Sequence, residues 1–293
     1  MDPGSFQEID PYVTHRHSDF GLDKKRFPGD SVVTGLGRIN GQKVAVAAQD
    51  FTVVGGSFSE VQAQKVCKVL DLALEAGLPF VSLNDSVGAR IQEGVWSLAG
   101  YSELFWRNTQ ASGVIPQISV MLGPCAGGSV YSPGLTDFIV MTEGISHMFI
   151  TGPEVIKTVL GEDISMEELG GAKVHSEITG NAHFFAESED ECFDQIKSLL
   201  SYLPWSNTAI ENGYQLLGFA GSALTVWLGI RRHWPGVVNL GSTFFVLYLY
   251  TKLFDWFWDW MPKYLFFLLL GLVAVLLLVV MRRFRARTGE AVA

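Results

Sequence analysis

Two glycine-rich segments of this 293-residue chain contain the residues best suited to chemistry. Residues 86–90 read Ser-Val-Gly-Ala-Arg, and residues 123–129 read Gly-Pro-Cys-Ala-Gly-Gly-Ser. Each follows a β-branched run and precedes a stretch with helical character, so small residues there let the main chain approach a ligand closely. Free amides at such a junction point toward negative charge, as in an oxyanion hole. Ordinary loop geometry gives the same spacing, so both interpretations stay open at this point.

Other chemistries lack their residues. Neither segment matches the GxxxxGK[ST] or GxGxxG phosphate-binding patterns. The chain has no Gly-x-Ser-x-Gly elbow, no HExxH and no paired-carboxylate spacing, and its histidines are scattered. The three cysteines, Cys67, Cys125 and Cys192, have no metal-ligand spacing, and we expect free, buried thiols and no metal. Charge stabilisation by main-chain donors therefore fits better than a side-chain nucleophile.

Composition divides the chain. Residues 1–204 carry 13 basic and 26 acidic side chains, whereas residues 205–293 carry 8 basic and 4 acidic ones. We therefore expect one domain over residues 1–204, a junction at 205–212 and a second segment over 213–293. An acidic chain without a clustered basic face is a poor nucleic-acid binder. The N-terminus lacks a secretory signal, which predicts a cytoplasmic location for the first domain.

The elements that must position the two turns are alternating strands and helices. Strands are expected at residues 43–49, 80–84, 117–122, 138–141 and 148–151. Helices are expected at 57–77, where Ser57 and Glu60 have capping-box spacing, at 96–111, and after Gly127. This alternation predicts an α/β domain with mostly parallel strands buried between helical layers.

A series of motifs in fixed order carries a resemblance. The motifs are residues 6–20 with Thr14-His15-Arg16, 28–35, 49–53 with 55–57, 88–94 (Gly-Ala-Arg-Ile-Gln-Glu-Gly), 113–118, 123–128, 149–153 and 168–172. Over residues 1–204 the chain closely resembles the β-subunit carboxyltransferases of propionyl-CoA carboxylase and the related methylmalonyl-CoA carboxyltransferases and decarboxylases. The resemblance implies a crotonase-like fold of repeated ββα units. It also implies transfer of a carboxyl group between biotin, on a separate carrier protein, and the α-carbon of a short acyl-CoA such as propionyl-CoA.

Two oxyanions form in that reaction, an enolate oxygen on the thioester and a ureido oxygen on biotin, and biotin itself can act as the base. The amide donors implied by the resemblance are Gly88, Ala89, Gly127 and Gly128. The implied substrate-binding residues are Arg90, Ala126, Phe51, Gly55 and Gly56. Arg90 is the candidate for a CoA phosphate or a substrate carboxylate, with a structural ion pair as the alternative. The implied partners are biotin carboxylase and biotin carrier subunits and further copies of the chain.

The chain departs from this family pattern in three ways. It starts inside the pattern, and it lacks the C-terminal half, which supplies the second oxyanion hole and the biotin-facing half of the site from a neighbouring subunit. We therefore expect little turnover by this chain alone. Val87 also replaces the first glycine of the usual Ser-Gly-Gly-Ala-Arg, which would be costly if φ there were positive.

Residues 213–293 contain three apolar stretches, at 214–230, 237–254 and 264–281, which we expect to be transmembrane helices. Aromatic residues crowd their ends. This segment resembles the C-terminal end of an uncharacterised multi-spanning bacterial membrane family through residues 231–234, 239–241, 254–259 and 282–285. The positive-inside rule would place residues 1–204 outside the cell, opposite to CoA thioesters, so we favour two joined gene fragments.

Two further functions remain open from the sequence. The first is the α subunit of a membrane-bound sodium-pumping methylmalonyl-CoA or glutaconyl-CoA decarboxylase, although few polar groups suited to ion transport lie between residues 214 and 281. The second is a non-catalytic, membrane-tethered CoA-binding or oligomerisation domain. Turnover and ion dependence would separate these functions from carboxyl transfer.

Overall fold

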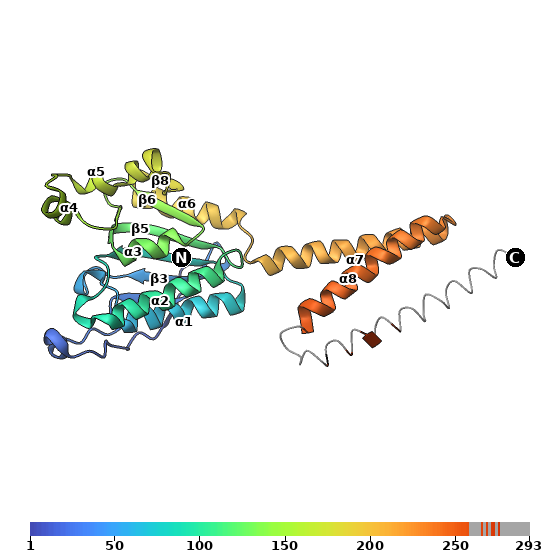
Figure 1. Ribbon diagram of the computed structural model, residues 1–293, viewed down its shortest axis with the longest axis horizontal. Helices are drawn as coiled ribbons and strands as arrows, with labels where there is room; N and C mark the ends of the chain where they lie inside the picture. Colours follow the sequence, from blue (N-terminus) through green and yellow to red (C-terminus); the bar gives the residue numbers. More distant parts are fainter. Residues whose placement is uncertain (258–264, 266–267, 269–270, 273–274, 276–293) are drawn as a thin grey trace. The chain divides into compact units, whose positions relative to one another are not determined.

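A computed structural model describes residues 1–257 and residues 265, 268, 271, 272 and 275. The chain divides into two units, Met1–Ile210 and Glu211–Ala293, and the boundary lies inside the 205–212 segment. Each unit is described by itself below (Figure 1).

The first unit is built on an eight-stranded sheet. Its strands are β1 (Gln7–Ile9), β2 (Val32–Ile39), β3 (Gln42–Gln49), β4 (Phe80–Ser86), β5 (Gln117–Ala126), β6 (Phe138–Thr142), β7 (His147–Phe149) and β8 (Phe184–Ala186). The order is β1-β2-β3-β4-β5-β6-β8, with β7 also paired to β5. The pairs β1–β2 and β2–β3 are antiparallel, and every pair from β3 to β8 is parallel. The carboxyl ends of β4 and β5 therefore lie at the same edge of the sheet.

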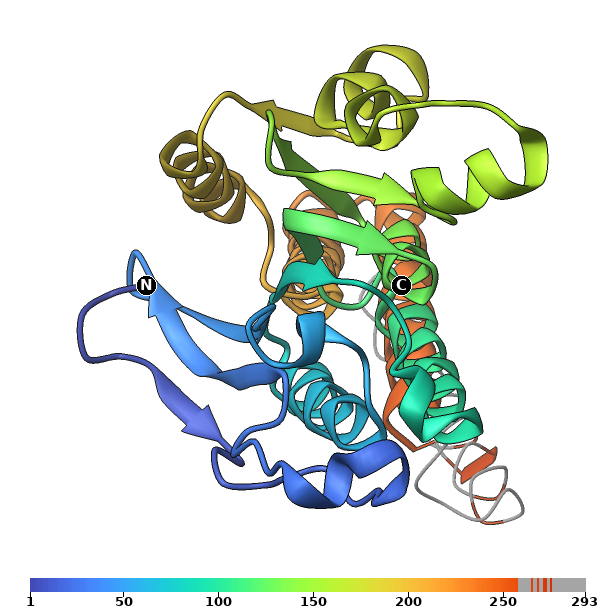
Figure 2. The ribbon, with the colours of Figure 1, turned by 90° about the vertical axis from the view of Figure 1, so that its left-hand side faces the viewer.

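Helices cover both faces of this sheet (Figure 2). They are α1 (Glu60–Ala76), α2 (Val95–Ala111), α3 (Gly128–Gly134), α4 (Pro153–Leu160), α5 (Met166–Gly170) and α6 (Glu189–Tyr202), with short turns η1 (Asp19–Lys24), η2 (Val54–Gly56), η3 (Ile91–Glu93) and η4 (Val174–Ile178). One core cluster joins α1 and α2 to one face through Val69, Leu70 and Leu104. A second joins α6 to the other face through Ile196 and Leu200. The expected α/β architecture is confirmed.

The expected elements agree with this architecture apart from two details. Each predicted strand overlaps one of β3 to β7, and the predicted helices correspond to α1, α2 and α3. The cap of α1, however, is Ser59 and not Ser57: the Ser59 hydroxyl accepts from the Gln62 amide. Strands β1, β2 and β8 and helices α4, α5 and α6 were not anticipated.

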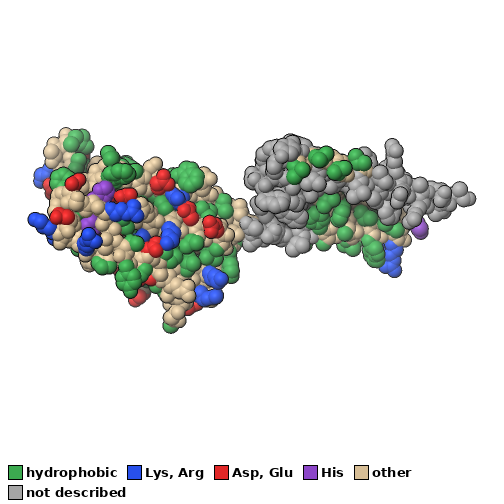
Figure 3. All heavy atoms as spheres, turned by 90° about the horizontal axis from the view of Figure 1, so that it is seen from below, with side chains coloured by type: hydrophobic (Ala, Val, Ile, Leu, Met, Phe, Trp, Pro, Cys, Tyr) green, Lys and Arg blue, Asp and Glu red, His purple; other side chains and the backbone are tan. Residues whose placement is uncertain are grey.

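Helix α4 differs from the other long helices of the first unit because none of its side chains is buried. Val155, Val159 and Leu160 are 49%, 72% and 66% exposed. On the face of the molecule seen in Figure 3, charged side chains of both signs are interspersed with apolar ones over the first unit.

The second unit contains α7 (Asn207–Arg231) and α8 (Pro235–Phe257), which cover the expected helices at 214–230 and 237–254. The two helices pack closely, because a Cβ on Gly241 would lie 3.0 Å from the backbone nitrogen of Val226 and 3.2 Å from the Ser222 carbonyl oxygen. Phe219 and Phe245 meet edge to face at 5.6 Å.

Within the part of the chain that the structure describes, no helix combines the length and the apolar character needed to cross a bilayer. The expectation that residues 214–230 and 237–254 are membrane spans is therefore not supported. The third expected span, 264–281, lies largely outside the described residues.

Candidate active site

The two glycine turns meet at the carboxyl edge of the sheet. Strands β4 and β5 run parallel, and Ser86 at the end of β4 is in register with Cys125 near the end of β5. A Cβ on Gly88 would lie only 2.8 Å from the carbonyl oxygen of Ala126. The first turn (residues 86–90) and the second turn (residues 126–129) are therefore in direct contact, as a shared site requires.

Turn η2 supports the first turn from its outer side. The Val87 amide donates to the Gly55 carbonyl at 3.1 Å. A Cβ on Gly56 would lie 2.1 Å from the carbonyl oxygen of Asp85, so only glycine fits there. Phe51, which precedes this turn, is 41% exposed. The structure thus brings Gly55 and Gly56, two of the expected substrate-binding residues, next to the first turn.

The four expected amide donors differ in their availability. Gly88 donates to the Ser86 hydroxyl at 3.2 Å. Gly127 donates to the carbonyls of Phe149 and Ile150, both at 3.2 Å. The amides of Ala89 and Gly128 have no acceptor among the described residues. Gly128 is the first residue of α3, where a helix leaves its amides unpaired. Each turn therefore keeps one amide for a ligand.

Backbone strain lies beside the first turn and not within it. Gly88 has φ 103°, whereas Val87 has no positive φ, so the expected cost of valine does not arise. Val54, by contrast, has φ 52° and is followed by Gly55 and Gly56 at 64° and 63°. A β-branched residue is disfavoured in this conformation. Val54 directly precedes Gly55, whose carbonyl accepts the Val87 amide of the first turn.

Arg90 makes the structural ion pair, one of the two roles that the sequence left open. Its side chain is fully buried, and its guanidinium pairs with Asp30 at 2.8 Å and with Glu93 at 3.3 Å. The contact with Asp30 is an ion pair without hydrogen-bond alignment. Arg90 also donates to the Ser57 hydroxyl at 3.1 Å and to the Ser31 hydroxyl at 2.9 Å. The guanidinium therefore faces the interior and anchors the exit of the first turn.

The same network continues to the N-terminal segment. A Glu93 carboxylate oxygen accepts from the Glu60 amide at 2.8 Å. The His17 Nε2 lies 3.1 Å from one carboxylate oxygen of Glu60 and 3.9 Å from Glu93. Ser59 donates to Asp30. These bonds tie residues 17 to 31, the start of α1 and the first turn into one unit.

Asp85 is a titratable group that the sequence analysis missed. Its Oδ1 is buried without a hydrogen-bond partner. The carboxyl lies flat against β5, where a Cβ on Gly123 would be 2.0 Å from Oδ1. Burial raises the pKa of Asp85, and the charge of Asp50 at the end of the neighbouring strand raises it further. The available signal was that each aspartate follows an amide side chain, Gln49 or Asn84, at the end of a predicted strand.

The cysteines are free and buried, as expected. Burial raises the pKa of Cys67 to about 11 and that of Cys125 to about 12, so both remain thiols at neutral pH. Cys125 borders the second turn, yet it does not supply a thiolate. Among the described residues, no three His, Cys, Asp or Glu side chains gather as metal ligands.

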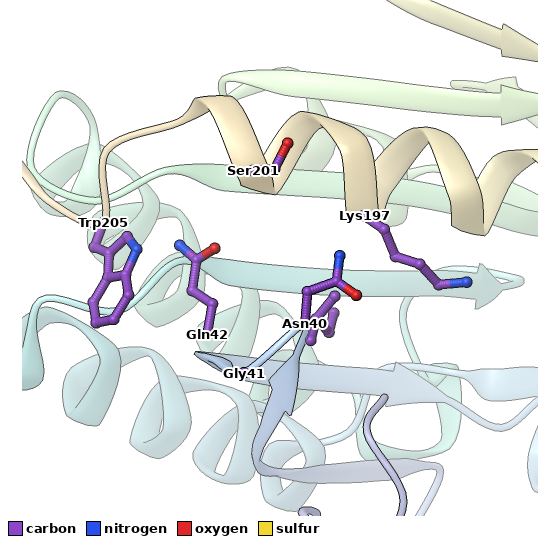
Figure 4. A pocket seen from close by; sticks show the side chains of 7 residues that line it. Asn40, Gly41, Gln42, Lys197, Ser201 and Trp205 are labelled. Atoms are coloured by element: carbon purple, nitrogen blue, oxygen red, sulfur yellow. The ribbon is translucent and has the colours of Figure 1, made fainter.

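A separate hollow of about 450 Å³ lies at the opposite edge of the sheet. It is bounded by the hairpin that joins β2 to β3 and by the last part of α6, with Gln42, Ser201 and Trp205 among its lining residues (Figure 4). This hairpin is at the amino end of β3, whereas the glycine turns follow the carboxyl ends of β4 and β5. The hollow is therefore not part of the glycine-turn site.

Known proteins match the first unit. The propionyl-CoA carboxylase carboxyltransferase subunit of Haloferax mediterranei is 57% identical over 207 residues, 71% of this chain and 40% of the relative. The methylmalonyl-CoA decarboxylase subunit alpha of Veillonella parvula is 58% identical over 207 residues, 71% and 41% of the two chains. The hexameric transcarboxylase 12S, solved with hydrolysed methylmalonyl-coenzyme A, is 54% identical with a TM-score of 0.69, covering 71% and 41%.

These likenesses support the crotonase-like α/β fold that the resemblance implied. The chain spans about 40% of the length of the curated relatives it matches. None of these matches identifies the expected membrane family in the second unit. The family described as the carboxyl transferase domain matches residues 1–213. Because this match covers more than two thirds of the chain, the chain belongs to the carboxyl transferase domain family.

Proposed function

We propose that the chain is the acyl-CoA-binding part of a biotin-dependent carboxyltransferase, acting on a short acyl-CoA such as propionyl-CoA. The observation that carries this proposal is the contact between the two glycine turns, each with an amide, Ala89 or Gly128, that has no acceptor among the described residues. Such donors stabilise an oxyanion where it forms, and two oxyanions form in carboxyl transfer.

The residues of the site fit the thioester. The Ala89 and Gly128 amides are the donors for the oxyanion that develops on its carbonyl oxygen. Biotin, when bound, supplies the carboxyl carrier and the base. The chain's own part is to bind the thioester, orient its α-carbon and stabilise negative charge on its carbonyl oxygen. Arg90, buried in ion pairs, acts by holding the first turn.

We propose that a second polypeptide segment completes the site, since the matched residues make up only 40% of the Haloferax mediterranei relative. Further copies of the chain, a biotin carboxylase and a biotin carrier subunit are the proposed partners. The assembly of transcarboxylase 12S as a hexamer supports an oligomer. A cytoplasmic location, where CoA thioesters occur, goes with this proposal.

Calorimetric titration of the full chain with propionyl-CoA tests the proposal. The chain should bind the thioester more tightly than free CoA. Ala89→Pro, which removes one amide donor, should weaken thioester binding and leave CoA binding unchanged. Val87→Ala is the matched control, because Val87 is exposed and its amide is already paired with Gly55. Absence of any thioester binding by the folded chain would refute the proposal.

A second candidate is decarboxylation, favoured by the 58% identity to the Veillonella parvula decarboxylase subunit. Incubation with methylmalonyl-CoA and free biotin separates the two reactions. Carboxyl transfer yields propionyl-CoA together with carboxybiotin, whereas decarboxylation releases carbon dioxide. Thioester binding with neither product, in the presence of the completing segment, would indicate a non-catalytic CoA-binding domain.

A further inference from the structure

Tyr101, on α2, lies between the two glycine turns. It is 4% exposed, and its ring stacks on Phe58 at a centroid distance of 4.1 Å. Phe58 in turn holds the first turn through two backbone hydrogen bonds: its amide donates to the Gly88 carbonyl at 2.8 Å, and its carbonyl accepts from the Arg90 amide at 2.9 Å. The ring of Tyr101 therefore supports the first turn indirectly, through Phe58.

The same side chain contacts the second turn directly. The Tyr101 hydroxyl lies 2.8 Å from the Ser129 hydroxyl, within hydrogen-bond distance. A Cβ on Gly128 would lie 2.7 Å from the Tyr101 ring, so glycine is required for this approach. The Gly128 amide and the Ser129 hydroxyl are thus both placed by the position of one tyrosine.

Burial raises the pKa of the Tyr101 phenol, so the hydroxyl stays protonated at neutral pH and can donate a hydrogen bond. Its hydrogen-bond partner in the structure is the Ser129 hydroxyl of the second turn.

We infer that Tyr101 is a positioning residue that sets the separation of the two turns, and hence of the Ala89 and Gly128 amides. The effect of Tyr101 on catalysis rests on the proposed function, whereas its role in placing the two turns does not. The ring contacts the first turn through Phe58 and the second turn at Gly128, and the hydroxyl contacts Ser129 of the second turn. Leucine would remove the ring contacts and the hydroxyl, whereas phenylalanine would remove only the hydroxyl.

Amide spectra test the structural part on the full chain. In ¹⁵N-labelled protein, Tyr101→Leu, which removes the ring, should shift the amide signals of both turns, including Ala89 and Gly128. Tyr202→Leu, at a tyrosine that is 84% exposed, is the matched control and should shift neither. A change confined to Ser129 and its neighbours would overturn the inference, because Tyr101 would then position only one turn.

Thioester binding tests the functional part. With propionyl-CoA labelled with ¹³C at the carbonyl, Tyr101→Phe should weaken binding roughly tenfold or less, the effect of one neutral hydrogen bond. It should also reduce the downfield shift of the bound carbonyl, whereas a merely structural role would lower the folded fraction and leave that shift unchanged. If the unaltered chain binds no thioester, the proposed function fails and the amide spectra alone decide on Tyr101.

A double-mutant cycle excludes a simple packing defect. Phe58→Leu and Ser129→Ala should have coupled effects on the thioester carbonyl shift when Tyr101, which contacts both residues, is present. The coupling should vanish when both are combined with Tyr101→Leu. Independent effects of the two substitutions in the presence of Tyr101 would contradict the inference.

Discussion

At the scale of single residues, the buried charged groups that anchor the first turn are the feature with the largest energetic cost of burial. The side chains of Arg90, Asp30 and Glu93 are all fully buried, and burying charges is costly unless they are paired. The network therefore stabilises the fold only while all three charged groups are present. Because both carboxylates hold the guanidinium in the interior, Arg90 acts on the site only through the backbone that it anchors.

Arg90→Met should lower the free energy of unfolding by about 3–5 kcal/mol, because it leaves two buried carboxylates without their cation. Arg90→Lys should recover only part of this loss, since an ammonium cannot reproduce the guanidinium fork. Arg16→Met is the control: the Arg16 side chain is 64% exposed and its pairing with Glu60 should be worth about 1 kcal/mol or less. Urea unfolding measures all three, and equal losses for Arg16 and Arg90 would contradict the assignment.

Asp85→Asn should stabilise the fold at pH 7. The pKa of Asp85 is raised above its ordinary value of 3.8, so the folded state holds the proton more tightly than the unfolded state. Its stabilising contribution is present below 3.8 and is lost as the pH rises through the raised value. The side chain of the Asp85→Asn variant does not ionise. Its free energy of unfolding should therefore equal that of the unaltered chain in acid and exceed it increasingly as the pH rises. Unfolding midpoints from pH 3 to 8 test this, with exposed Asp163→Asn showing no such trend.

The residues of the site were only partly predictable. The glycine turns could be found because small residues after apolar runs form a local pattern. Tyr101 and Asp85 could not, because their importance comes from neighbours distant in the sequence: Tyr101 meets Ser129, and Asp85 meets Gly123. Nor could the sequence separate the free amides of Ala89 and Gly128 from the paired ones, since their acceptors come from elsewhere in the fold.

At the scale of elements, strand prediction succeeded where β-branched runs were buried on both faces, as in β3, β4 and β5. It failed for β2, which contains Gly35 and Gly37. A Cβ on Gly35 would lie 2.7 Å from the Phe6 ring, so the glycine reflects close packing by an N-terminal segment. Such a requirement is invisible locally. Likewise, Ser59 caps α1 in place of the predicted Ser57, because the Ser57 hydroxyl accepts a hydrogen bond from Arg90.

Two helix caps allow a matched comparison of element stability. Ser188 caps α6 by accepting the Glu191 amide and is exposed, so Ser188→Ala should cost about 1 kcal/mol. Ser59 caps α1 and also donates to the buried carboxylate of Asp30. Ser59→Ala should therefore cost about 2–4 kcal/mol, the cap plus a hydrogen bond to a charged group. Chemical denaturation measures the difference, and equal costs would show that the bond to Asp30 contributes nothing.

At the scale of the whole molecule, the first unit contains its own sheet, both helical layers and the complete pair of glycine turns. Its core clusters draw only on residues before Pro204. Folding of this unit should therefore not depend on residues 211–293.

A chain ending at Ile210 should unfold cooperatively, with a midpoint within a few degrees of that for the first unit in the full chain. Calorimetry on both chains measures this, and the amide signals of the glycine turns provide a second comparison. A large drop in midpoint, or the loss of those signals, would show that the second unit stabilises the first.

Helix α4, in which no side chain is buried, has a consequence for the order in which this fold opens. A segment with so little buried surface exchanges its amide hydrogens through local opening events that leave the sheet intact. In deuterated water, amides of residues 156–160 should exchange orders of magnitude faster than those of β4 and β5. The loop before α4 supplies the Phe149 and Ile150 carbonyls that hold the Gly127 amide, so the second turn borders the least protected part of the unit.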